Sequence, residues 1–271
     1  MLIPKILKIE VTNRCNARCV FCSHRFFDEK RLKDMPIELV RRLLDEAATW
    51  KRKPEVQFSG FGEPTLYGHL VESVEYCSQK GMRSHFYTNG MMLTPSLIEE
   101  LVQSGLTWFL LTVDARDKKT FESIRVGLNF ETVENNVKEA WKICKNSKTN
   151  MRLASVMCKE NKNDITNIKN HWKDYAHSYK IIGEIPLVEG RTKYHPANYC
   201  RKKAWTQILV RVNGDVPFCC IDVADEYITS GNVKNQNMLE IFNSKEAVDL
   251  RNRISQEKDL PPMCQRICFS K

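Results

Sequence analysis

Three cysteines stand close together near the start of the chain, in the stretch CNARCVFC that follows a short apolar run. Cys15, Cys19 and Cys22 are separated by three and then by two residues, a spacing that lets thiolates of one loop bind one metal centre. A structural zinc site is closed by four protein ligands, whereas three ligands leave one position open. The trio therefore predicts a metal centre with a place for a ligand that is not protein.

The remaining cysteines indicate metal binding rather than disulfides. The chain has eleven cysteines, gathered mainly toward its two ends. An odd number of thiols in a reducing compartment argues against a disulfide framework and favours metal ligation. Cys77 and Cys144 are exceptions, because they fall on predicted helices and are expected to be small buried apolar residues.

Length and composition describe a folded unit of enzyme size. The chain has 271 residues, of which 42% are apolar and 28% charged, without repeats or low-complexity tracts. The first twelve residues lack the pattern of a signal peptide, and the longest later apolar run, Trp108–Val113, is too short to cross a bilayer. We therefore expect a cytoplasmic protein with no membrane partner. The net charge of +9 is spread over predicted helices, which indicates a solvated surface more than a nucleic-acid site.

The pattern of apolar residues predicts strands that alternate with helices over the first two thirds of the chain. Strands are predicted at Lys8–Val11, Glu55–Ser59, Ser84–Tyr87, Trp108–Val113, Met151–Val156 and near Ile181. Helices are predicted between them at Ile37–Thr49, Leu70–Gln79, Pro95–Gln103, Val133–Cys144 and Ile165–Tyr175. About six such units build an α/β fold, in which a parallel sheet curves or closes into a barrel with its site at the carboxyl ends of the strands.

The alternation ends after Ile182. The range 184–199 contains several turn-forming residues and predicts a linker. Beyond it, Asn213-Gly214 between two β-rich runs predicts a hairpin, and an amphipathic helix is predicted from Met238 onward. The chain is thus expected to consist of a barrel over 1–183, the linker, and a small hairpin-plus-helix module over 200–271.

The first cysteine loop resembles the cluster loop of the radical S-adenosylmethionine (SAM) superfamily, with an aromatic residue directly before the third cysteine. FSGFGEPTL, YTNG and LTVDA strengthen the resemblance because they stand in order at successive predicted strand ends, although Phe61 is inserted between the two glycines and Thr112 replaces a serine. The resemblance implies a partial (β/α)6 TIM-like barrel, in which the three cysteines hold a [4Fe-4S] cluster that SAM completes. A stray trio of thiols or an incomplete zinc site is the alternative. By the resemblance, the residues that bind SAM are Phe21, Gly60, Gly62, Glu63, Pro64, Thr88, Asn89, Thr112 and Asp114.

The second group of cysteines resembles the auxiliary-cluster module of SPASM and twitch radical SAM enzymes. Cys200, thirteen residues, Gly214, four residues and Cys219 match its opening half, and the region that ends in Cys264 and Cys268 matches its closing half. The resemblance implies that these four thiolates hold a second, auxiliary [4Fe-4S] cluster, with the shorter twitch version fitting best. Cys264 and Cys268 are three residues apart where two is usual. A four-thiolate zinc site is the alternative, because tetrahedral thiolate ligation suits both metals.

The implied reaction is reductive cleavage of SAM to a 5′-deoxyadenosyl radical that abstracts a hydrogen atom from the substrate. We expect oxidation of a small polar molecule such as a sugar, an aminocyclitol or a nucleotide-linked sugar, with the auxiliary cluster accepting an electron and a flavodoxin or ferredoxin as electron donor. This expectation uses the lack of an additional N-terminal domain of the kind that grips a leader peptide. The alternatives are a peptide maturase that forms a crosslink, a thioether or an epimerised residue, and a carbohydrate epimerase. For epimerisation, Cys158 and Cys220 are the candidate hydrogen-atom donors. A non-catalytic iron-sulfur or zinc protein that binds nucleic acid would require the strand-end motifs to be accidents.

Overall fold

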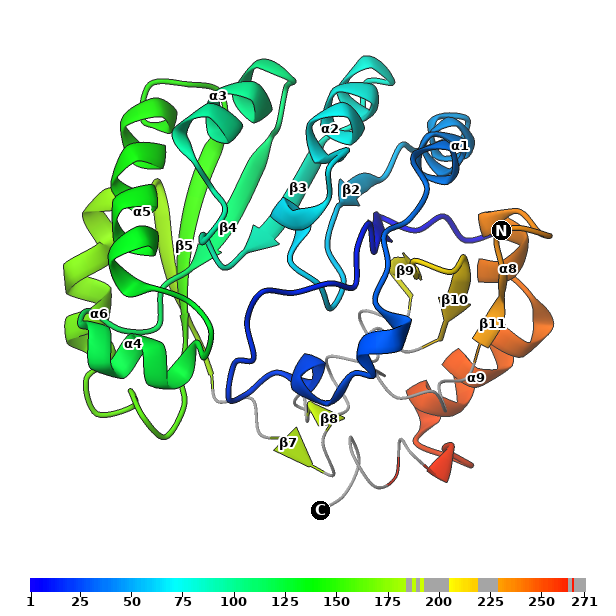
Figure 1. Ribbon diagram of the computed structural model, residues 1–271. Helices are drawn as coiled ribbons and strands as arrows, with labels where there is room; N and C mark the ends of the chain where they lie inside the picture. Colours follow the sequence, from blue (N-terminus) through cyan, green and yellow to red (C-terminus); the bar gives the residue numbers. More distant parts are fainter. Residues whose placement is uncertain (184–186, 189–190, 193–204, 219–228, 263–264, 266–271) are drawn as a thin grey trace.

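The main element of the fold is a parallel sheet of seven strands. The structure is a computed structural model that describes residues 1–183, 187–188, 191–192, 205–218, 229–262 and 265. The strands lie in the order β6-β5-β4-β3-β2-β1-β9, and all neighbours run parallel (Figure 1). Their bounds are β1 (Ile6–Ile9), β2 (Glu55–Gln57), β3 (Ser84–Thr88), β4 (Trp108–Thr112), β5 (Asn150–Val156), β6 (Ser178–Ile182) and β9 (Gln207–Val210). The predicted α/β fold with a parallel sheet is confirmed.

Helices cover one face of this sheet, which we call the outer face (Figure 1). The outer face buries large apolar side chains against the helices, and Phe86 and Phe109 are both 0% exposed. On the opposite, inner face, the next residue along β3, Tyr87, is 41% exposed. Successive side chains of a strand point to opposite faces, so one face is apolar and packed while the other is accessible. The helices are α1 (Ile37–Ala48), α2 (Leu70–Gln79), α3 (Pro95–Gln103), α5 (Phe130–Cys144) and α6 (Ile165–Trp172).

The ends of these helices are set by local hydrogen bonds. Thr94 caps α3 by accepting a hydrogen bond from the Leu97 N–H, and Pro95 occupies the first turn, where its missing N–H costs nothing. Asn129 accepts a hydrogen bond from the Thr132 N–H at 2.9 Å, so α5 begins at Phe130 and not at Val133 as predicted. Asparagine caps are common, and the sequence prediction missed this one.

One helix, α4 (Lys118–Ile124), was not predicted at all. It is only seven residues long and buries just Phe121 and Ile124, so it gives almost no apolar periodicity. Its start is fixed by Asp117, whose side chain accepts a hydrogen bond from the Thr120 N–H at 2.9 Å. The helix follows β4, and its carboxyl end supports the cysteine loop described below.

The C-terminal part holds a small antiparallel sheet of β10 (Asp215–Pro217) and β11 (Thr229–Asn232), followed by α8 (Met238–Phe242) and α9 (Lys245–Gln256). The expected small hairpin and helix are therefore present. The predicted turn also forms, since Gly214 has a φ of +90° and the Arg211 N–H donates to the Asp215 carbonyl. The pairing differs from the prediction, however, because β10 pairs with β11, whereas β9 joins the large sheet beside β1.

The pairing of β9 has a simple cause. Ile208 and Val210 are 2% and 0% exposed, so this strand is buried like the other strands of the parallel sheet. Two further short strands, β7 (Leu187–Val188) and β8 (Arg191–Thr192), pair with each other. No helix within the described ranges has the length and apolar composition needed to cross a membrane.

The two-faced sheet makes a stability prediction. Phe86→Ala should lower the free energy of unfolding by about 3–5 kcal/mol, because it empties a fully buried position of the outer face. Tyr87→Ala is the matched control, since the neighbouring side chain lies on the inner face and is already 41% exposed; its loss should be at most about 2 kcal/mol. Denaturant unfolding of both variants under anaerobic conditions measures the difference, and equal losses would contradict the assignment of the faces.

Candidate functional site

The cysteine loop lies against the end of α4. The Arg18 N–H donates to the Val126 carbonyl at 2.8 Å, and the Val20 N–H donates to the Ile124 carbonyl at 3.0 Å. Gly127 allows this contact because its φ is +96° and a Cβ there would lie 3.0 Å from the loop backbone. The unpredicted helix thus supplies the surface on which the three cysteines are presented.

The three thiols are shielded from solvent to different degrees. Cys19 is 6% exposed, while Cys15 and Cys22 are partly buried. Burial raises the pKa of Cys15 to about 12 and that of Cys22 to about 11. The thiols of Cys15 and Cys22 therefore stay protonated at neutral pH in the absence of a cation, and a metal that binds them must displace their protons.

Arg125, just after α4, is the residue of the site that sequence reasoning missed. Its Nε donates to the Asp114 carboxylate, and its Nη1 lies 3.4 Å from the Cys19 sulfur. The guanidinium carbon lies 4.9 Å from the centroid of the Phe21 ring. Its Nη2 is buried with no acceptor among the residues that the structure describes. No periodic pattern pointed to this arginine, because it follows a helix that the pattern did not reveal.

The charges around Arg125 favour its cationic form. Burial alone would lower the pKa of Arg125, but the Asp114 carboxylate and Cys19 raise it above the usual value of an arginine. Asp114 is 0% exposed and uses both oxygens, because Oδ1 accepts the Val156 N–H at 2.7 Å while Oδ2 accepts from Arg125. Asp114, which the resemblance gave as a SAM-binding residue, holds Arg125 beside Cys19 in the structure.

The glycine-rich turn after β2 packs directly on the start of the cysteine loop. A Cβ on Gly62 would lie 2.4 Å from the Thr12 carbonyl oxygen, and a Cβ on Gly60 would lie 2.3 Å from the Glu10 side chain. Both positions therefore need glycine for close approach rather than for an unusual φ. The inserted Phe61 lies under Arg211, whose guanidinium carbon is 5.0 Å from the ring centroid.

Glu63 joins this turn to the end of β3. Its buried carboxylate accepts hydrogen bonds from the Thr65 N–H and hydroxyl, the Thr88 hydroxyl and the Asn89 N–H, at 2.7–3.1 Å. Burial raises its pKa, and the hydrogen bonds act in the opposite direction. Pro64 follows at the first position of a 3-10 helix (Pro64–Leu66) that Glu63 caps. With four donors bound, the carboxylate is largely occupied within the chain.

The other strand-end residues lie beside the same loop. The Asn89 side chain donates to Asn16 Oδ1 at 2.7 Å, which ties the end of β3 to the cysteine loop. The Thr112 hydroxyl donates to the Thr88 carbonyl at 3.4 Å and is half-buried. The structure therefore brings the predicted SAM-binding segments and the three cysteines together at one end of the sheet.

Cys158 lies at this end too, in the loop after β5. It is 6% exposed, and its N–H donates to Asn161 Oδ1, while the Asn161 amide donates to the Asp114 carbonyl at 2.9 Å. Burial raises the pKa of Cys158 to about 12, so the side chain is a thiol at neutral pH. The predicted auxiliary ligands and the second candidate donor lie outside the described residues: Cys200, Cys219, Cys220, Cys264 and Cys268.

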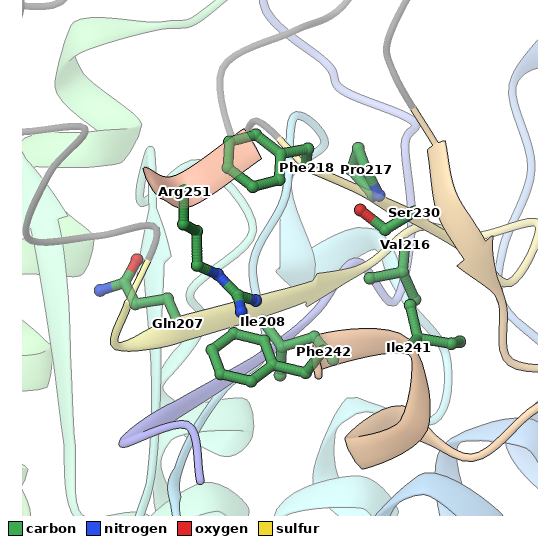
Figure 2. A pocket seen from close by; sticks show the side chains of 9 residues that line it. All are labelled: Gln207, Ile208, Val216, Pro217, Phe218, Ser230, Ile241, Phe242 and Arg251. Atoms are coloured by element: carbon green, nitrogen blue, oxygen red, sulfur yellow. The ribbon is translucent and has the colours of Figure 1, made fainter. Parts of the chain in front are cut away.

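A small pocket lies in the C-terminal part of the chain. It lies among β9, β10, β11, α8 and α9 and is lined mainly by apolar side chains, including Phe218, which directly precedes Cys219 (Figure 2). Arg251 extends into it, with its guanidinium carbon 3.8 Å from the centroid of the Phe242 ring. Burial lowers the pKa of Arg251 to about 10.

The donor set of the first loop fits an iron-sulfur cluster. Within the described part of the chain, no three histidine, cysteine or acidic side chains are grouped as the ligands of one metal ion would be. A [4Fe-4S] cube differs, because each thiolate binds a different iron. The buried cationic Arg125, with one N–H near a sulfur and another nitrogen lacking an acceptor in the described residues, suits the negative charge of such a cluster.

Comparison with known families decides the assignment. Residues 9–171 match the model of the radical SAM superfamily. The chain belongs to the radical SAM superfamily. Residues 200–269 match SPASM, an iron-sulfur cluster-binding domain, so the cofactors of this radical SAM protein are [4Fe-4S] clusters and SAM.

Individual relatives agree with the superfamily. The tungsten-containing aldehyde ferredoxin oxidoreductase cofactor-modifying protein of Pyrococcus furiosus is 29% identical over 138 residues, which are 49% of this chain and 38% of that protein. Three curated relatives are matched over only 26–53% of their own length.

Two solved radical SAM structures share the fold. BtrN in complex with AdoMet (SAM) and 2-DOIA is 18% identical, with a TM-score of 0.62 over 94% of this chain and 89% of BtrN. Native anSMEcpe with bound AdoMet and Cp18Cys peptide is 18% identical, with a TM-score of 0.69 over 98% of this chain and 88% of that chain. These similarities confirm the partial barrel.

The buried pair beside Cys19 makes a second stability prediction. Arg125→Met should lower the free energy of unfolding by about 3–5 kcal/mol, because it leaves the Asp114 carboxylate buried without its cation. Arg116→Met is the matched control. It removes an arginine from an aspartate pair of the same kind, Arg116–Asp164, whose side chains are 49% and 37% exposed, and should leave the free energy of unfolding nearly unchanged. Chemical denaturation compares the two, and similar losses would show that the buried pair does not hold the site together.

Proposed function

We propose that the chain is a radical SAM oxidase of a small polar molecule, such as a sugar, an aminocyclitol or a nucleotide-linked sugar. The observation that carries the proposal is the convergence of the three-cysteine loop with the segments Gly60–Pro64, Thr88–Asn89 and Thr112–Asp114 at one end of the sheet. When bound, the reduced cluster supplies the electron that cleaves SAM to a 5′-deoxyadenosyl radical, which abstracts a hydrogen atom from the substrate. The side chains of the protein position the reactants and exclude water.

The described side chains take distinct parts in this proposal. Cys15, Cys19 and Cys22 are the thiolate ligands, and Arg125 stabilises the negative charge at Cys19. Phe21 packs against the Arg125 guanidinium. Thr112 is half-buried and keeps a hydroxyl at the rim where SAM would lie. Asp114 acts through Arg125 and is therefore a positioning residue.

The glycine-rich turn and the end of β3 form the floor of the proposed SAM site. Gly60 and Gly62 let the backbone approach closely, as their contacts with Glu10 and Thr12 indicate. Pro64 fixes the turn, and Glu63 ties it to Thr88 and Asn89. We therefore propose that Glu63 shapes the site mainly by holding Thr88 and Asn89 in place, and less by direct contact with SAM.

Oxidation is supported by the SPASM match over residues 200–269, because a second cluster with four protein ligands gives the substrate electron a place to go. We propose Cys200, Cys219, Cys264 and Cys268 as its ligands and a flavodoxin or ferredoxin as the electron donor. A small-molecule substrate is supported by the similarity to BtrN in complex with 2-DOIA. The polar side chains of the inner face of the sheet also suit such a substrate.

Peptide modification is the second candidate function. The observation in its favour is the similarity to anSMEcpe with a bound peptide, which covers 98% of this chain. Epimerisation remains the alternative outcome for a carbohydrate or a peptide, and Cys158 is the buried thiol at the rim that would return a hydrogen atom.

Iron content and SAM cleavage test the cofactors and their ligands. Anaerobically reconstituted protein should contain about eight irons and eight sulfides per chain, and the triple change of Cys15, Cys19 and Cys22 to alanine should leave about half. With dithionite, the unchanged protein should convert SAM to 5′-deoxyadenosine, and the triple variant should not. The Cys77→Ala variant is the control, because this buried thiol lies on α2 and should not change the iron content. Stoichiometric zinc at the C-terminal cysteines, or S-adenosylhomocysteine as the only product, would contradict the proposal.

Oxidation and epimerisation differ in where the substrate electron goes. For an oxidase, Cys200→Ala or Cys219→Ala should abolish the product while 5′-deoxyadenosine still forms, because the first cluster is unchanged. For an epimerase, turnover in D2O would place one deuterium at the altered carbon, and Cys158→Ala or Cys220→Ala would stop turnover. Mass spectrometry of the product distinguishes them, and solvent deuterium at an inverted centre would overturn oxidation.

A further inference from the structure

The inner face of the sheet carries polar and aromatic side chains where the outer face is apolar. One row of neighbouring residues runs from Lys8 through Gln57 and His85 to Trp108. The Cα of each residue is the register partner of the next, so the side chains of the row share one face. In the next row, Tyr87 is 41% exposed even though it lies on the central strand of the sheet. This part of the inner face is therefore accessible to a ligand.

Trp108 holds an arginine in place on this face. Its ring stacks on the His85 ring with centroids 3.9 Å apart, and the Arg152 guanidinium carbon lies 4.0 Å from the Trp108 ring centroid. The Trp108 Nε1 donates to Glu55 at 2.6 Å, which fixes the ring. A guanidinium that stacks on an aromatic ring keeps its in-plane N–H groups for a planar acceptor such as a carboxylate or a phosphate.

Arg152 and Lys180 have no carboxylate partner in the described part of the chain. There the Arg152 side chain donates one hydrogen bond, to Asn150 Oδ1 at 3.3 Å, and the Lys180 side chain donates none. Burial and then the nearby Arg152 lower the pKa of Lys180, as expected of two cations without an anion between them. Glu55 does not neutralise them, because it is already paired with His85 and Arg83.

The two cations lie below the rim of the site. Lys180 is the register partner of Ala154, which is the partner of Thr112, so Lys180 stands at the level of a residue proposed to line the SAM site. Strands are about 4.8 Å apart, which puts these two Cα atoms roughly 10 Å from each other. Arg152 lies one row, or about 6.6 Å, further from the rim. An anion held here leaves room for the rest of a small substrate to reach the rim.

We propose that the inner face binds an anionic group of the substrate, a phosphate or a carboxylate, with Arg152 and Lys180 as its ligands. This inference rests on the proposed radical SAM function and narrows its substrate to an anionic small molecule. The charge argument favours an anion because two neighbouring cations repel a further cation, and neither has a carboxylate partner among the described residues. Tyr87 lies in the same row as Arg152, two strands away, and its exposed ring is the surface on which the uncharged part of the substrate packs.

Anion binding by the holoenzyme tests the inference without knowledge of the substrate. The probes are inorganic phosphate and succinate, each titrated anaerobically in the presence of SAM while the midpoint of thermal unfolding is followed. A bound anion raises this midpoint by an amount that grows with the logarithm of 1 + [L]/Kd, so the dependence on anion concentration gives the apparent Kd. The midpoint of the unchanged protein should rise with at least one probe, and the response to one probe or the other distinguishes a phosphate from a carboxylate. Arg152→Gln and Lys180→Gln should each weaken the apparent affinity about tenfold or more.

Matched variants keep the result interpretable. Lys169→Gln removes the same charge from the exposed surface of α6 and should respond as the unchanged protein does. Lys180→Arg keeps the positive charge and should bind the anion as the unchanged protein does. If Arg152→Gln fails to fold, as judged by circular dichroism, Lys180→Gln against Lys180→Arg carries the test. Equal responses of all variants, no response of the unchanged protein, or the same response to chloride at equal ionic strength would overturn the inference. SAM cleavage by the unchanged protein is scored separately, so a failure here is distinguished from a failure of the proposed function.

Discussion

The buried ion pair between Asp114 and Arg125 is the constraint on which the site depends. Neither charge is solvated, so each is tolerated only because the other is held in place. The arginine in turn lies against the Cys19 sulfur and the Phe21 ring, and its own helix binds the backbone of the cysteine loop. A loop rich in thiols thus gains a fixed position from a single charge pair at the end of β4. The hydrogen bond between Asn16 and Asn89 ties the same loop to the end of β3.

The sheet separates stability from chemistry. Its outer face buries apolar side chains under the helices, and this packing does not involve the polar groups of the inner face. The inner face carries Glu55, His85 and Trp108 in one hydrogen-bonded and stacked group, and the Arg152 guanidinium lies over the Trp108 ring. The carboxyl ends of the same strands carry the cysteine loop and the glycine-rich turn. Different substrates can therefore be accommodated by changes on one face that leave the core intact.

The sequence predicted most of the strands and long helices, because apolar runs and helical periodicity report on burial directly. The bounds of α2 and α3 agree with the predictions to the residue. Two features were missed for physical reasons: α4 is too short to show a period, and the partner of β9 depends on a contact between the two ends of the chain. Motif order also located the site. The order of the motifs did not reveal that the carboxylates of Glu63 and Asp114 accept hydrogen bonds from other groups of the protein. Hydrogen-bond partners follow from the fold and not from the residue type.

The place of β9 has a consequence for how this chain folds during synthesis. β1 is translated first, yet one of its two neighbours, β9, emerges about two hundred residues later. Until then β1 has an unpaired edge, a template on which another chain could add a strand. The loop with the three thiols follows this strand directly, so its thiols are present on the nascent chain well before the sheet is complete. Completing the sheet requires a pairing between β1 and β9, which lie far apart in the sequence, and long-range pairings of this kind form slowly.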